Sequence, residues 1–397
     1  MKFADRIQRL GTETAFAVSS EAAAWAAQGH KVYPFHLGDM NIPTPANVME
    51  AAVKAMQDGK TGYCPNAGIP QLREILAADV GASRGVRYAM ENVAIQPGGK
   101  PTIGKFFLTL LNPGDEVLYP SPGYPIYESQ IEFLGGVPKP YRYLEGARTF
   151  TIDLDMLKRQ ITPRTRILVL NDLQNPTGAE CSAAEREALA ELVLAHDLYV
   201  LCDEAYFDIR YDGRSASFVS LPGMAERCVI LYTFSKKFAM TGWRLGAAIG
   251  PKPIIDVIAK LNVNDESCSN HFIQYAAIEG LTGDPGGPQE ILRILKERRD
   301  LAVELLNEIP GVRCLRPNAT FYLYPNVTGA MQRKGFSDYE SFRRSLLQAT
   351  GVSVCSRIHF GRPLPGETDF YIRLAYSGID APEIRAGLAA FKAFVEA

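Results

Sequence analysis

The sequence lacks the patterns that mark disulfide-rich, metal-binding, membrane and nucleic-acid-binding proteins. Its seven cysteines are odd in number, scattered and without a C-x-x-C pair, and its five histidines are isolated. We therefore expect reduced thiols and no metal site. The net charge is −2 without a Lys/Arg block, no apolar run approaches membrane-spanning length, and the N-terminus lacks an apolar signal-peptide core. These absences predict a cytoplasmic protein that binds neither nucleic acid nor a membrane.

What the sequence does contain is an alternation of strand and helix patterns. The composition, 47% hydrophobic and 22% charged, is typical of a globular protein. The length of 397 residues suggests one large domain and a smaller one. Helical patterns separate several apolar runs, and one of them, 182–196, opens with Ser182 and Glu185 in capping-box positions. This rhythm predicts an α/β fold with a largely parallel sheet, whose expected strands are 117–119, 167–170, 198–202, 228–232 and 245–249.

The order of predicted helices and strands changes near residue 289. A long charged helix is expected over 291–308, and shorter elements follow it: strands at 312–315, 320–324 and 370–374, and helices at 339–348 and 382–395. We interpret this part as a second, α+β domain that the N-terminal helix around 14–28 joins. The predicted division is an N-terminal segment of the small domain at 1–45, a large domain at 46–290 and a small C-terminal domain at 291–397.

The segment 233–246 suggests the chemistry. It places Lys236 directly after the hydroxyl residues Thr233 and Ser235 and shortly before Arg244. An amine that can form a Schiff base, beside hydroxyl and guanidinium groups that can hold a phosphate, is what pyridoxal phosphate requires. Standing alone, the segment could equally be a basic surface loop, so the interpretation depends on other segments that supply the remaining parts.

A phosphate site is predicted at the start of the helix expected over 101–111. Gly99 and Lys100 precede Pro101, and a helix start that is exposed by glycines offers free N–H groups to an anion. A Gly-Gly pair alone is most simply a turn. Combined with the hydroxyl and guanidinium donors of 233–244, the Gly-Gly pair is predicted to form one side of a phosphate-binding site.

Polar residues at the ends of other strands complete the predicted site. Asp203 ends a buried strand, where it is either a helix cap or a carboxylate that pairs with the cofactor's pyridine nitrogen. The Tyr206 hydroxyl can donate a hydrogen bond to the cofactor's ring oxygen, or Tyr206 can be a tyrosine at the edge of the core. Asn175 lies in a turn and can hold the same oxygen from the other side. Tyr124 can stack on the cofactor ring. Arg373 sits inside an apolar strand, so it requires an anion: either a structural carboxylate or a substrate α-carboxylate.

Together these segments resemble the pyridoxal-phosphate-dependent class I and II aminotransferases of fold type I. The Ser-Lys-x-x-x-Met-Thr-Gly-Trp-Arg and Asn-Pro-Thr-Gly motifs mark the resemblance, which runs from about residue 15 to the C-terminus. It implies a large domain with a mostly parallel, seven-stranded sheet sandwiched by helices, and a smaller α+β domain. It also implies that Lys236, rather than Lys237, is the Schiff-base lysine, with cofactor contacts from Tyr124, Asn175, Asp203, Tyr206, Thr233, Ser235 and Arg244.

The resemblance extends to the substrate and to a second subunit. Gly38 and Arg373 match contacts to the substrate α-carboxylate, and Asn175 is expected to bind the substrate as well as the cofactor. Tyr63 matches a tyrosine that reaches the phosphate of the neighbouring subunit, which implies a homodimer with shared active sites. The implied reaction moves the amino group of an L-amino acid to a 2-oxo acid in two stages. In both stages Lys236 transfers the Cα proton, so its pKa should be lowered by partial burial and nearby cations.

The sequence leaves the substrate and the reaction outcome open. Arg357 and His359 would favour an acidic or polar substrate, whereas Asp265 and Glu266, near a neighbouring subunit's site, would favour a basic one. A lyase, a decarboxylase or an amino-acid oxidase of the same fold would keep all of these residues. A ligand-sensing regulator normally adds a DNA-binding domain, for which the residues before Asp39 offer no room.

Overall fold

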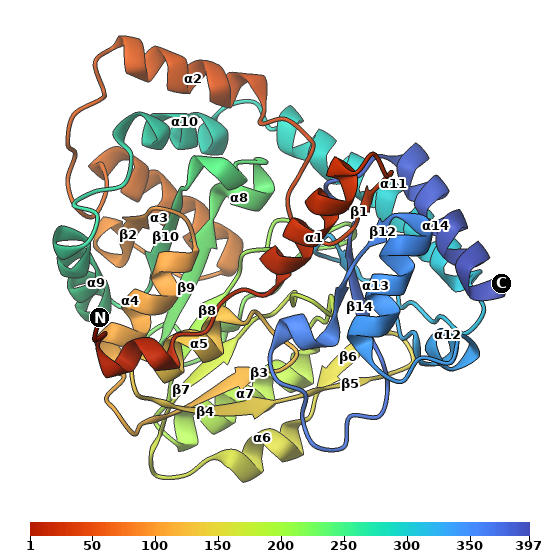
Figure 1. The fold of residues 1–397 in the computed structure, drawn as a ribbon. Coiled ribbons are helices and arrows are strands. Elements are labelled where there is room, and N and C mark those ends of the chain that lie inside the picture. Colours follow the sequence, from red (N-terminus) through yellow and green to blue (C-terminus); the bar gives the residue numbers. More distant parts are fainter.

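The computed structural model describes residues 1–397 and has a seven-stranded sheet at its centre (Figure 1). Only β10 runs antiparallel to its neighbours, so the prediction of an α/β fold with a mostly parallel sheet is confirmed. In order across the sheet the strands are β2 (Val93–Gln96), β10 (Gly246–Ile249), β9 (Cys228–Thr233), β8 (Tyr199–Asp203), β7 (Thr165–Leu170), β3 (Glu116–Pro120) and β4 (Val137–Tyr141).

Helices cover both faces of this sheet because the side chains of its strands alternate between two apolar clusters. On β8, Val200 and Cys202 enter one cluster and Leu201 enters the other. The first cluster is covered by α2 (Ala46–Gln57), α3 (Pro70–Arg84), α6 (Leu154–Gln160), α7 (Ala183–Ala195) and α10 (His271–Thr282). The second is covered by α4 (Lys100–Leu110), α5 (Ile126–Phe133) and α9 (Lys252–Asn264).

A second core lies beside the sheet and consists mainly of residues from Ile291 onward, together with Phe35. Its helices are α1 (Ala15–Ala27), which packs at its edge, α11 (Gly286–Asn307), α12 (Thr328–Arg333), α13 (Tyr339–Thr350) and α14 (Ala381–Glu396). Its strands form a sheet of β11 (Tyr322–Leu323), β14 (Ile372–Ala375) and β13 (Cys355–Ser356), and a parallel pair of β1 (Tyr33–Pro34) and β12 (Val352–Ser353).

Local signals set several element boundaries. The Ser182 hydroxyl accepts a hydrogen bond from the backbone N–H of Glu185, and the Glu185 carboxylate accepts one from the backbone N–H of Ser182, as the capping box predicts. The strand expected over 312–315 is wrong, because Arg313 makes only an isolated bridge with Asn326. The remaining elements are the hairpin β5 (Tyr143–Glu145) and β6 (Phe150–Ile152), the short α8 (Phe234–Lys237) and five 3-10 turns: η1 (Asp5–Arg9), η2 (Met90–Asn92), η3 (Phe218–Ser220), η4 (Thr241–Trp243) and η5 (Arg357–Phe360).

The arrangement brings functional candidates to one edge of the sheet. The parallel strands β3, β7, β8 and β9 end side by side, and Tyr124, Asn175, Asp203 and Lys236 lie at or just after those ends. Ligands of open α/β sheets bind at this edge. None of the helices combines the length and the apolar character that crossing a bilayer requires.

Candidate active site

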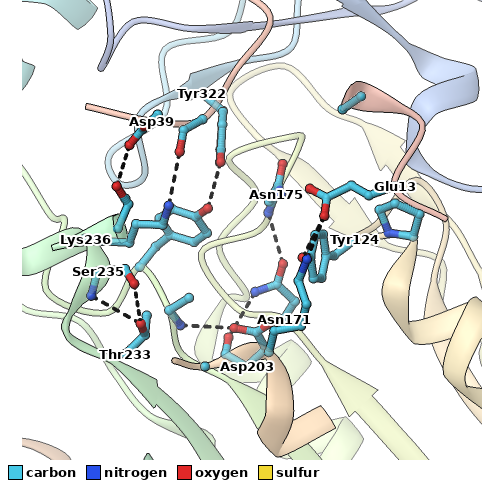
Figure 2. A pocket seen from close by; sticks show the side chains of 18 of the residues that line it. Glu13, Asp39, Tyr124, Asn171, Asn175, Asp203, Thr233, Ser235, Lys236 and Tyr322 are labelled. Carbon is cyan, nitrogen blue, oxygen red and sulfur yellow. Dashed lines mark hydrogen bonds and ion pairs between the residues drawn. The ribbon is translucent and has the colours of Figure 1, made fainter. Parts of the chain in front are cut away.

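A cleft of about 490 Å³ lies where the carboxyl ends of the strands face the second core (Figure 2). All but one of the predicted site residues line it. These are Gly38, Gly99, Lys100, Tyr124, Asn175, Asp203, Tyr206, Thr233, Ser235, Lys236, Arg244 and Arg373. The exception is Tyr63, a residue that is 90% exposed and lies outside the cleft of its own chain.

Lys236 projects from α8 into this cleft. The Thr233 hydroxyl caps α8 by accepting a hydrogen bond from the Ser235 N–H at 3.2 Å, and the Lys236 ammonium donates to the Gly38 carbonyl at 3.1 Å. Burial lowers the pKa of Lys236 to about 8, with smaller contributions from Arg373 and Arg244, while Asp39 opposes the shift. The lowered pKa that the sequence predicts is therefore confirmed, and a substantial fraction of the amine is neutral near physiological pH.

The lowered pKa of Lys236 predicts how the stability of the protein depends on pH. The native amine releases its proton near pH 8 and the unfolded one near 10.5, so the unfolded chain binds more protons between these values and stability rises with pH across that window. Below pH 8 the charged amine is destabilising. We expect Lys236→Met to stabilise the cofactor-free protein by about 2 kcal/mol at pH 7, less than full linkage because water reaches the cleft. Urea unfolding of the wild-type and Lys236→Met proteins at pH 7 and pH 10 checks this. Equal free energies of unfolding for the two proteins at pH 7 would contradict it.

A cradle for a phosphate lies between α4 and the segment after β9. Arg244 adopts a left-handed backbone conformation and is held by a hydrogen bond from its guanidinium to the Thr241 carbonyl at 2.7 Å. Gly98 has φ +100°, and a Cβ there would lie 2.1 Å from the Arg244 guanidinium, so only glycine allows this approach. The N-terminus of α4, which begins after Gly99, adds its free N–H groups. Hydroxyls, a guanidinium and a helix start therefore converge, as a phosphate requires.

Asp203 ends β8 on the cleft floor. Tyr127 donates a hydrogen bond to its Oδ2 at 2.5 Å and the Ala205 N–H donates to its Oδ1 at 3.1 Å. Burial raises the pKa of Asp203, while these two hydrogen bonds act in the opposite direction and favour the ionised form. Tyr127, which no sequence pattern singled out, lies in α5, and its ring packs edge-to-face against that of Tyr124 with 5.8 Å between the ring centroids.

Tyr206 and Arg373 line the wall that faces the second core. The Tyr206 hydroxyl lies 2.8 Å from that of Tyr322, another residue that no sequence pattern singled out. The Arg373 guanidinium is buried between the rings of Tyr322 and Phe360, and its hydrogen bonds go to uncharged groups, among them Asn175 Oδ1 at 3.3 Å. No Asp or Glu side chain pairs with it, so the structural ion pair is absent, and the fork for a substrate carboxylate stays the prediction.

The four residues considered for substrate selection are distributed unevenly. Arg357 is buried and ion-paired with Glu367 at 2.7 Å, and it does not line the cleft. The Glu266 carboxylate pairs with the Lys105 ammonium at 2.5 Å, and the Asp265 carboxylate lies 3.8 Å from the same ammonium. Neither acidic residue lines the cleft of its own chain. His359 does line it, and burial lowers its pKa, which favours the neutral imidazole.

The donor set fits pyridoxal phosphate. Gly98 leaves the room in which Arg244 can approach a phosphate, Asp203 is the buried carboxylate that a pyridine nitrogen requires, and Lys236 supplies an amine of lowered pKa. When bound, the cofactor supplies a ring that accepts the electrons of a broken Cα bond. The fold and this site define a pyridoxal-phosphate enzyme of fold type I.

Comparisons with known proteins identify the family. A family model described as aminotransferase class I and II matches residues 31–391. The chain is 34% identical to the aspartate aminotransferase of Geobacillus stearothermophilus over 96% of each sequence, and 31% identical to the asparagine–oxo-acid transaminase of Streptococcus mutans over 100% of this chain and 99% of that one. The structure of Thermus thermophilus aspartate aminotransferase with maleate superposes with a TM-score of 0.90 at 32% identity, covering 99% of both chains. The chain belongs to the class I and II aminotransferases and is a pyridoxal-phosphate-dependent transaminase.

Proposed function

We propose that the enzyme moves the amino group of an L-amino acid to a 2-oxo acid by a ping-pong mechanism in which Lys236 is both the Schiff-base lysine and the proton carrier. The observation that supports this most directly is that a lysine of lowered pKa and a buried arginine without a carboxylate partner share one cleft. Arg373 orients the substrate by its α-carboxylate, which presents the Cα proton to the Lys236 amine.

The other cleft residues hold the cofactor in this proposal. Arg244 and the hydroxyls of Thr233 and Ser235 bind its phosphate together with the N-terminus of α4. Asp203 keeps the proton on the ring nitrogen, and the charge-assisted hydrogen bond from Tyr127 keeps that carboxylate in place. The remaining contacts are those of Tyr206 and Asn175 with the ring oxygen and of Tyr124 with the ring face.

Titration of the purified enzyme with single amino acids tests the proposed function. Acidic, amide, aromatic, aliphatic and basic donors are added in turn while the visible absorption of the lysine-bound cofactor is followed. A transaminase loses that band with its donor and recovers it when a 2-oxo acid is added. Ammonia or carbon dioxide without recovery would instead indicate a lyase, an oxidase or a decarboxylase, and a regulator would bind without turnover.

We propose in addition that the enzyme is a homodimer with shared active sites. The outer side of α2 exposes Met49, Val53 and Met56, each with about two fifths to half of its surface in solvent. These side chains line an apolar groove of about 620 Å³ that extends to Trp243 and Arg244, next to the phosphate cradle. An exposed apolar surface of this kind marks an interaction site, and we take its occupant to be a second copy of the chain that supplies its Tyr63 to the cradle.

Tyr63→Phe tests the shared site. The phenol cannot serve its own cleft, so we expect the variant to remain a dimer but to bind the cofactor about fivefold more weakly, because one hydrogen bond to the phosphate is lost. Light scattering gives the mass, and absorbance titration of the cofactor-free protein gives the affinity. Tyr275→Phe, on α10, is the matched control. A monomer, or unchanged cofactor affinity in Tyr63→Phe, would contradict the shared site.

We take the donor to be a short polar amino acid and the compartment to be the cytoplasm. The relatives at 34% and 31% identity are named for aspartate and asparagine, which differ only in the end of the side chain. The cleft offers polar side chains beyond the α-carboxylate fork, namely Lys100, Glu13 and His359. All seven cysteines are free thiols, which suits a reducing compartment.

A further inference from the structure

One contact in the cleft pairs two charged side chains of the protein itself (Figure 2). Glu13 lies in the segment between η1 and α1, and its Oε2 accepts hydrogen bonds from the Lys100 ammonium at 2.9 Å and from the Tyr124 hydroxyl at 3.1 Å. The Glu13 side chain is 22% exposed and lines the same cleft as Lys236. The Lys100 ammonium is therefore not a free cation, while its backbone remains at the helix start that is predicted to bind the cofactor phosphate.

The charges of the cleft show why this contact matters. Four of the residues that line it are lysines or arginines. In the proposed function Lys236 serves the amine, Arg244 the phosphate and Arg373 the α-carboxylate. His359 is not a fifth cation, because burial lowers its pKa. Lys100 is the one cation left for the side chain of a substrate, and it is already neutralised.

The segment that carries Glu13 is fixed at both ends. Before it, the Arg9 guanidinium donates to the Glu132 carbonyl of α5 at 2.9 Å. After it, Ala15 and Val18 pack in a small apolar cluster with residues of the second core. Figure 1 shows this stretch running from η1 beside α5 across the molecule to α1. Glu13 is thus held at the cleft by its backbone as well as by its side-chain bonds.

We propose that Glu13 is a specificity-determining residue that occupies Lys100 and thereby disfavours donors with a side-chain carboxylate relative to their amides. The proposal rests on the transaminase reaction proposed above. An acidic side chain must displace Glu13 from two hydrogen bonds or lie beside a like charge, and either is unfavourable. An amide of the same length can donate to Glu13 and accept from Lys100, so it meets no such penalty.

Binding of two unreactive analogues to the holoenzyme tests the proposal. Succinate and its monoamide, succinamate, differ only in the group that would face Glu13. Calorimetry should show that the wild-type enzyme binds succinamate at least as tightly as succinate. Glu13→Gln should tighten succinate about tenfold, because Lys100 becomes available for a charge-assisted pair, and should change succinamate far less. The ratio of kcat/KM for aspartate to that for asparagine should rise by a similar factor.

Two further variants make the result specific. Adding Lys100→Gln to Glu13→Gln should remove the gain in succinate affinity, and Glu21→Gln, the same change in α1 at a residue that does not line the cleft, should leave the succinate-to-succinamate ratio as in the wild type. Tighter wild-type binding of succinate than of succinamate, with a ratio that Glu13→Gln leaves unchanged, would overturn the proposal. The calorimetric result stands even if no amino acid cycles the absorption band, so it is separable from failure of the proposed reaction.

Discussion

Replacing Lys236 with alanine is expected to lower the rate of amino-group transfer by about 10⁴-fold, because the group that carries the Cα proton is lost. The visible band of the lysine-bound cofactor should also disappear, since no amine remains to form the Schiff base. Stopped-flow absorbance with a large excess of the amino donor measures both effects. Added primary amines of increasing basicity should restore part of the rate if proton transfer is the missing step.

Lys237→Ala provides a matched control next to it in the sequence. The Lys237 ammonium lies 3.5 Å from the Asp208 carboxylate and does not line the cleft. Such a partly exposed pair contributes little, so this variant should stay within about threefold of the wild-type rate. A Lys236→Ala protein that kept its absorption band, or a Lys237→Ala protein that lost it, would show that the lysines are assigned the wrong way round.

Asp203→Asn is expected to lower the rate by about 10³-fold while the fold is retained. An amide occupies the same space, but it cannot keep a proton on the ring nitrogen, so the ring becomes a weaker electron acceptor. Single-turnover rates with saturating donor measure the effect, and circular dichroism checks the fold. Asp203→Asn turnover within tenfold of the wild type would contradict the assignment.

Tyr127→Phe separates the role of the carboxylate from that of its support. The Tyr127 hydroxyl contacts Asp203 and is fully buried beneath the cleft. Its removal should slow the reaction by only about tenfold, because one hydrogen bond to the charged form is lost while the carboxylate remains. An effect as large as that of Asp203→Asn would mean that Tyr127 contacts the cofactor or the substrate directly.

The sequence predicted the middle of the sheet well and its margins poorly. The five strands that it indicated lie in the interior or carry continuous apolar runs, and each is found within two residues of its expected bounds. Strand β4 escaped notice because Pro138 and Pro140 interrupt its pattern, which an edge strand tolerates because one side forms no ladder. The expected strand at 312–315 failed for the opposite reason, since an apolar alternation there has no partner strand to pair with beyond one bridge.

The same division holds in the site. Residues that follow buried strands could be placed from sequence, because parallel strands end at one edge of a sheet. Three other residues could not, because each acquires its role from a residue far away in the chain. These pairs are Tyr127 with Asp203, Tyr322 with Tyr206, and Glu13 with Lys100. Arg357 shows the reverse error, since a basic residue near the expected pocket proved to be paired with Glu367.

The bond between Arg373 and the His36 carbonyl spans 337 residues of chain. Contacts of such sequence separation form late in folding, after local helices and neighbouring strands. During synthesis, the ribosome must therefore release almost the whole polypeptide before the amino-acid pocket can exist. A chain that stops short of β14 would contain every strand of the seven-stranded sheet and Lys236, but it would lack the arginine that is proposed to bind the substrate α-carboxylate.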